Sequence, residues 1–91
     1  MSTLFVITQN CTESIPVNNY HRVFIESVSV NGEKWFDIKV EEIPCYGCED
    51  DYQLLGSYHS DVQAQRVLEE LTVFRASKRS CYKMPASHQY L

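Results

Sequence analysis

The dipeptide Asn31-Gly32 constrains the fold of this chain more than any other local feature. It separates RVFIESVSV (residues 22–30) from EKWFDIKVEEI (residues 33–43), and both runs are rich in β-branched and aromatic residues. Asn and Gly accept the positive φ angles of a type I′ turn, whose twist matches that of two antiparallel strands. The sequence therefore predicts a β-hairpin centred on this turn.

Three further segments carry clear secondary-structure signals. Residues 3–9 (TLFVITQ) are apolar on both alternating faces, as in a central strand, and residues 52–58 (YQLLGSY) predict a fourth, short strand. Ser60 and Gln63 fit a capping box, in which the Ser hydroxyl accepts from the Gln amide and the Gln side chain reaches back to the cap. We expect one amphipathic helix over about residues 61–77.

The order of these elements predicts an α+β fold, in which one amphipathic helix packs on one face of a four-stranded antiparallel meander sheet. A short extended piece at residues 15–17 fits the loop that follows the first strand. The apolar stripe of the helix is expected to cover the sheet. The expected contacts join Val67, Leu68 and Leu71 to Ile38 and Leu54.

A chain of 91 residues suffices for one modest core, so we predict a single domain over residues 1–77. Residues 78–91 form a basic tail with aromatic residues, either disordered or held down by Tyr82, Met84 and Tyr90. No apolar run approaches the roughly 18 to 20 residues of a membrane span, and the start does not resemble a secretory signal. We expect a cytoplasmic protein without a membrane partner.

Charge is divided unevenly along the chain. Residues 1–73 hold four cations and all twelve acids, a net charge of −8, whereas the last eighteen residues hold only cations. These cations are Arg75, Lys78, Arg79 and Lys83. Either this basic end lies across an acidic surface of its own chain or of a second copy, or it binds phosphate or an acidic partner. Because the acidic body repels phosphates, direct binding of duplex nucleic acid is disfavoured.

The runs LFVITQN near the start and LGSYHSDVQAQRVLEEL at residues 55–71 carry a resemblance to known proteins. With the IPVNN segment and the hairpin, they resemble a group of small uncharacterised proteins of Gram-positive bacteria and their phages. That group shares a strand-rich N-terminal half and an LG-x-Y strand followed by an S-x-x-x-A-x-x-V-L-E-E-L helix. The resemblance covers roughly residues 4–71. It implies a phage or mobile-element setting and no particular reaction.

This chain departs from that pattern at residues 43–51, IPCYGCEDD, where a C-x-x-C pair runs into three acids. A structural zinc site needs four ligands, and the chain has four cysteines: Cys11, Cys45, Cys48 and Cys81. Cys11 and Cys81 are isolated in sequence, which is not typical of a zinc site. The acids at residues 49–51 disfavour both a cluster of thiolates and a redox thiol with a lowered pKa. We favour a two-residue turn at Tyr46 and Gly47, and we expect no metal or other cofactor.

No sequence motif of a catalytic centre is found, and three glycines leave little for a phosphate-binding loop, so we expect no enzymatic activity. Eleven aromatic residues are many for one helix-on-sheet core. Alternation places Phe5, Ile7, Phe24 and Trp35 partly on the face away from the helix. An uncovered apolar face predicts a partner, and we expect a homodimer.

Our leading hypothesis is a non-enzymatic accessory protein of a phage or mobile element that binds and inhibits a host defence protein complex in the host cytoplasm. The residues expected to contact that partner are Trp35, Tyr46, Glu49, Asp50 and Asp51. One alternative is a small-ligand binder that sequesters a nucleotide signal. Its expected ligand contacts are Arg75, Lys78, Arg79, Tyr82 and Lys83. A second alternative is an interaction module that binds structural zinc through the four cysteines.

Overall fold

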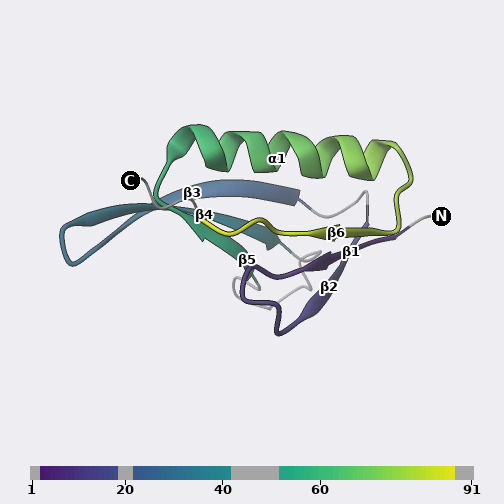
Figure 1. The fold of residues 1–91 in the computed structure, drawn as a ribbon, viewed down its shortest axis with the longest axis horizontal. Coiled ribbons are helices and arrows are strands. Elements are labelled where there is room, and N and C mark those ends of the chain that lie inside the picture. The colour runs from purple at the N-terminus through teal and green to yellow at the C-terminus, as the bar shows by residue number, and fades with distance from the viewer. Residues whose placement is uncertain (1–2, 19–21, 42–51, 88–91) are drawn as a thin grey trace, which may run out of the picture.

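The computed structural model describes residues 3–18, 22–41 and 52–87. Its elements are β1 (Leu4–Ile7), β2 (Ser14–Val17), β3 (Arg22–Val30), β4 (Glu33–Glu41), β5 (Tyr52–Tyr58), α1 (Asp61–Ala76) and β6 (Cys81–Lys83). The predicted hairpin, the strand at residues 52–58 and the helix are confirmed, and the extended piece at residues 15–17 is β2. Figure 1 shows α1 lying across one face of the strands.

The β3-β4 hairpin forms as the turn residues predict. Asn31 has a φ of 51° and Gly32 a φ of 80°, the positive values that a type I′ turn requires. The register runs without a break from Arg22 opposite Glu41 to Val30 opposite Glu33. The tip of this hairpin projects beyond the rest of the molecule (Figure 1).

The described strands form two three-stranded sheets, so the predicted four-stranded meander is wrong in its topology although the α+β class is confirmed. One sheet has the antiparallel order β3-β4-β5. In the other, β1 lies between β2, to which it is antiparallel, and β6, to which it is parallel. Both edges of β1 are therefore occupied by strands other than those of the hairpin.

Both sheets and the helix share one hydrophobic core. Its buried residues are Leu4, Val6, Ile15, Val17, Ile38, Val40, Leu55, Tyr58, Ala64, Val67, Leu71, Tyr82 and Met84. The face of the β3-β4-β5 sheet that carries Ile38 and Val40 is turned toward α1, and we call the opposite face the outer face. Because side chains alternate along a strand, Trp35, Asp37 and Lys39 lie on that outer face.

A register shift at Ile38 and Lys39 decides which leucine of β5 faces the core. Leu55 is 1% exposed, whereas Leu54 is 50% exposed and lies on the outer face. The expectation that Leu54 packs under the helix is therefore wrong, because a bulge changes the alternation of the strand. Leu68 is only partly buried, which also corrects the expected core stripe.

At the start of α1, the structure shows one of the two hydrogen bonds of the predicted capping box. The Gln63 amide donates to Ser60 Oγ (3.2 Å), as the capping box predicts. The Gln63 side chain does not complete the box. Its Nε2 instead donates to the carbonyl of Ala86 (2.9 Å), so that it ties the helix to the C-terminal segment.

Residues 78–87, set apart as a tail by their composition, contribute β6 to the first sheet. Tyr82 and Met84 are buried, and the Tyr82 hydroxyl donates to Glu70 Oε1 (2.6 Å). The described part of this segment is therefore ordered and held against the core by Tyr82 and Met84, which was one of the two expectations. Tyr90 lies outside the described residues. In the described part of the chain, no helix has both the length and the apolar character needed to cross a membrane.

Candidate functional site

An open groove lies on the outer face of the β3-β4-β5 sheet and has a volume of about 630 Å³. Residues from both strands of the hairpin, from β5 and from the segments after β1 and β6 line it. They are Gln9, Val28, Val30, Trp35, Asp37, Leu54, Ser57, Ala86 and Ser87. We call this feature the outer groove.

The walls of the outer groove are apolar. Val28 lies directly opposite Trp35 in the hairpin, so the two side chains share the outer face. Val30 and Leu54 are 51% and 50% exposed, which is high for aliphatic side chains that share one groove. Apolar side chains gathered in this way are typical of a surface that binds another molecule.

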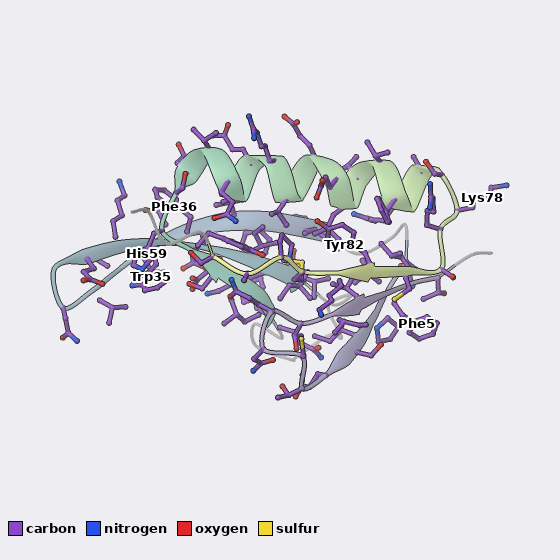
Figure 2. The ribbon with its side chains drawn as sticks, in the orientation of Figure 1. Phe5, Trp35, Phe36, His59, Lys78 and Tyr82 are labelled. Atoms are coloured by element: carbon purple, nitrogen blue, oxygen red, sulfur yellow. The ribbon has the colours of Figure 1, made fainter. Side chains whose placement is uncertain are left out.

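Trp35 is held in place by His59. The two rings lie 3.4 Å apart between centroids and are tilted by 35°. Figure 2 shows them side by side near the base of the projecting hairpin, away from the helix. The amide of His59 in turn lies 3.4 Å from Ser87 Oγ, to which it donates. The His59 ring therefore covers one face of the Trp35 indole.

Asp37 and Ser57 are among the polar residues that line the outer groove, and we call these two its floor. The Ser57 hydroxyl donates to Asp37 Oδ1 (2.6 Å). A carboxylate accepts more than one hydrogen bond, so Asp37 retains capacity for a donor from a ligand. Lys39, the next residue of β4 on this face, is paired with Glu26 at 2.9 Å. The cation nearest to Asp37 along the strand is thus already engaged by another carboxylate.

The rim formed by residues 85–87 is fixed by hydrogen bonds from neighbouring elements. The Tyr58 hydroxyl donates to the Pro85 carbonyl (2.7 Å), and Gln63 Nε2 donates to Ala86. Burial, with a smaller contribution from the charge of Glu70, raises the pKa of Tyr58 well above its usual range, so this donor stays protonated. These hydrogen bonds fix this rim of the groove within the chain itself.

The described polar cluster does not have the arrangement of a catalytic triad. A nucleophilic serine requires a base within hydrogen-bond reach, and that base requires an orienting group. Here Ser57 donates directly to the carboxylate of Asp37, while the ring of His59 is stacked on Trp35. This geometry offers a shaped surface with a carboxylate in it, and it suits binding.

Of the residues predicted to contact a protein partner, Trp35 lies in the outer groove. Tyr46, Glu49, Asp50 and Asp51 lie outside the described residues. Gln9, Asp37 and Ser57 were not predicted. Alternation along β4 could have indicated Asp37, because it shares a face with Trp35. Gln9 comes from the other sheet, and no local signal in the sequence links it to β5.

The basic residues proposed for phosphate binding are partly used within the fold. Arg75 Nη2 donates to the Asn18 carbonyl (2.9 Å), and burial lowers the pKa of this guanidinium. The Arg79 guanidinium lies over the ring of Phe74, at 5.3 Å from its centroid.

The aromatic residue of the same predicted site, Tyr82, is buried and packs edge to face against Phe74, with 4.8 Å between ring centroids. Its ring is therefore not available for stacking on a base. Lys78 and Lys83 are exposed, and Figure 2 shows Lys78 extending outward from the end of the molecule.

The cysteines proposed as zinc ligands divide between described and undescribed parts of the chain. Cys11 and Cys81 are exposed free thiols, and Cys45 and Cys48 lie outside the described residues. Within residues 3–18, 22–41 and 52–87, no cluster of three or more His, Cys, Asp or Glu side chains could hold a metal ion. The described residues thus supply at most two of the four proposed thiolate ligands.

Comparison with known proteins gives no family to which the chain can be assigned. No protein-family model, no curated protein and no solved structure matches it.

Proposed function

We propose that this chain is a non-enzymatic protein whose outer groove binds an extended segment of another protein, in which an apolar side chain lies next to an arginine or lysine. The observation that carries the proposal is the combination of aliphatic walls with one carboxylate on the floor. Val30 and Leu54 are half-exposed, and Asp37 lines the same groove. The apolar side chain would cover the walls, and the cation would pair with Asp37.

The charge of the whole chain favours a basic partner. The residues before Phe74 carry a net charge of −8. An acidic surface attracts a cationic segment during encounter and repels an acidic one, which affects the association rate and the choice of partner. Residues 49–51 add three of these acids, and we propose them, with Tyr46, as a second contact for the same partner.

The resemblance to small proteins of Gram-positive bacteria and their phages extends this proposal to the partner's identity. In a phage or mobile-element setting, the partner would be a host defence complex, and occupation of its surface would inhibit it. The nucleotide-sequestering alternative is less well supported, since Tyr82 is buried and Arg75 donates to a backbone carbonyl of its own chain. Stoichiometric zinc in protein purified without chelator would instead favour the zinc-binding module.

The experiment is a selection of random linear peptides displayed on filamentous phage against the immobilised wild-type chain. We expect the selected peptides to share an aliphatic or aromatic residue within two positions of Arg or Lys. Their affinity should fall at least about tenfold with Asp37→Asn, which removes the charge, and with Leu54→Asp, which places a carboxylate on the wall. Val73→Asp is the matched control, because Val73 is 58% exposed but lies on the helix.

Two outcomes would contradict the proposal. Selected peptides that bind all four proteins equally would place the site elsewhere on the chain. A thermal-shift screen that finds one stabilising nucleotide, with the shift lost on Lys78→Ala and Lys83→Ala, would transfer support to the nucleotide-binding alternative.

A further inference from the structure

The outward edge of β3 carries backbone groups that can pair with another strand. Among the strands that the structure describes, β3 is an end strand of its sheet and pairs with β4 alone. In a hairpin with a two-residue turn, the flanking residues Val30 and Glu33 form a hydrogen-bonded pair, and the pattern then alternates along the strand. The residues whose N–H and C=O groups point away from β4 are therefore Val23, Ile25, Ser27 and Ser29.

These groups have no backbone partner among the described residues. The backbone hydrogen bonds outside the regular elements, as far as the structure describes the chain, do not involve β3. The opposite edge of the same sheet differs, because the Gln9 amide donates to the Leu55 carbonyl of β5 (2.9 Å). An open strand edge is a template for pairing with a second chain.

β3 carries few of the features that protect an edge strand from pairing, its charged side chains being Arg22 and Glu26. Its sequence, RVFIESVSV, contains neither proline nor lysine, and its register with β4 is unbroken over nine residues. The bulge in this sheet lies between β4 and β5 instead. Proline, lysine and bulges are the usual means by which an edge strand avoids association. The edge is thus long, regular and suited to pairing.

We propose that two copies of this chain associate through antiparallel pairing of β3 with β3, about a two-fold axis at Ser27. The partner that fits this edge is a second copy because the strand is self-complementary in that register. Ser27 would lie opposite Ser27 of the other copy, and Ile25 opposite Ser29. All three have outward backbone groups, so each of these pairs exchanges hydrogen bonds.

Side chains on the outer face select this register over its neighbours. With the axis at Ser27, Val30 of one copy lies opposite Phe24 of the other, and Val28 lies opposite Glu26. Moving the axis to Glu26 places two carboxylates opposite each other, which is destabilising. Moving it to Ile25 sets Phe24 against Glu26 and leaves the half-exposed Val30 uncovered. Of these three registers, only the Ser27 axis places the half-exposed Val30 opposite the partly buried Phe24.

The assembly joins the two outer grooves. Val28 and Val30 belong to both the groove and the paired strand. In the dimer, Phe24 of the second copy extends the apolar wall beyond Val30, so each groove gains a side chain that one copy cannot supply. The pairing itself depends on backbone groups and does not require that the proposed groove function be correct.

Sedimentation velocity over a concentration series tests the proposal, with circular dichroism to establish that each variant is folded. Ser27→Pro removes an outward N–H from each copy, and an edge strand accepts proline where the N–H does not serve its own sheet. We expect it to weaken self-association at least about tenfold, since two symmetry-related donors are lost. Ser27→Thr keeps the amide and should remain dimeric like the wild type.

Hydrogen exchange of the wild-type protein provides a second measurement that does not depend on the folding of a variant. We expect the amides of Ile25, Ser27 and Ser29, the three residues that pair across the two-fold axis, to gain protection as the protein concentration rises. The alternate amides, bonded to β4, are an internal reference. A monomer at all concentrations would overturn the proposal, as would a dimer in which these three amides exchange freely or in which Ser27→Pro has no effect. If Asp37→Asn abolishes peptide binding while the dimer persists, the result concerns the proposed function of the groove and leaves the β3–β3 pairing supported.

Discussion

The side chain of Gln9 holds Ser57 by both of its backbone groups. Gln9 Nε2 donates to the Ser57 carbonyl (2.9 Å), and Gln9 Oε1 accepts from the Ser57 amide (2.8 Å). The carboxamide thus acts like a strand neighbour for β5, and it connects the sheet that contains β1 to the sheet that contains β5. The same serine donates its hydroxyl to Asp37 on the floor of the outer groove.

Replacing Gln9 by methionine should destabilise the protein by about 1–3 kcal/mol, because the backbone groups of Ser57 lose both partners in a partly buried place. Chemical denaturation measures the change. Gln65→Met is the matched control, since Gln65 lies on the exposed face of α1 and bonds only Asp61 (3.1 Å) among the contacts described. Equal stabilities of the two variants would show that the Gln9 contacts contribute little.

The two leucines of β5 should respond very differently to truncation. Leu55→Ala removes a fully buried side chain and should cost about 2–5 kcal/mol, whereas Leu54→Ala changes a half-exposed one and should cost less than about 1 kcal/mol. Thermal unfolding of the two variants checks the position of the bulge. A larger loss for Leu54→Ala would mean that the strand alternates without the register shift.

Stability should fall at alkaline pH because of Tyr58 and Tyr82. Burial raises the pKa of both hydroxyls well above the usual range, and for Tyr82 the hydrogen bond to Glu70 adds to this effect. A group whose pKa is raised by folding stabilises the protein fully below its unfolded pKa of about 10, and this contribution is lost as pH rises toward the folded value.

Denaturant unfolding between pH 9 and 11.5 measures this dependence. Each of the two tyrosines should contribute a slope of up to about −1.4 kcal/mol per pH unit above pH 10. Tyr82→Phe should therefore show a shallower decline than the wild type. Parallel curves for the two proteins would indicate that Tyr82 ionises equally readily in the folded and unfolded chains.

Removal of residues 81–91 should unfold the protein, although composition alone marks this segment as a tail. The deletion removes β6 and the buried side chains of Tyr82 and Met84. Lys83→Ala, at the exposed position between them, should leave the stability within about 0.5 kcal/mol of the wild type. A cooperative thermal transition in the truncated chain would show that the segment is dispensable for the fold.

The parts of the fold that sequence could predict are those determined by near neighbours. Asn31 and Gly32 specify a turn through their own φ angles, and Ser60 caps a helix through an amide three residues away. The parallel pairing of β1 with β6 joins residues more than seventy positions apart, and β6 has only three residues. A strand that short has no periodicity from which its partner could be inferred.

The outer groove was predictable only in part for the same reason. Trp35 and Asp37 share a face of one strand, which alternation indicates. Gln9 and Ser87 reach the groove from opposite ends of the chain, and their positions depend on how the two sheets meet. A bulge determines that Leu54, and not Leu55, lines the groove. Because the two residues are adjacent and identical, the sequence does not indicate where the bulge lies.

The position of β1 between β2 and β6 also sets an order of events during synthesis on the ribosome. β2 can pair with β1 as soon as both have emerged, but the other edge of β1 waits until residues 81–83 have been made. Contacts between segments so distant in sequence close a long loop, which slows folding. The hairpin, β5 and α1 can assemble earlier, since their contacts are closer in sequence. We therefore expect the nascent chain to expose Val6 and Ile15 until β6 leaves the exit tunnel, and we expect it to depend most on chaperones during that interval.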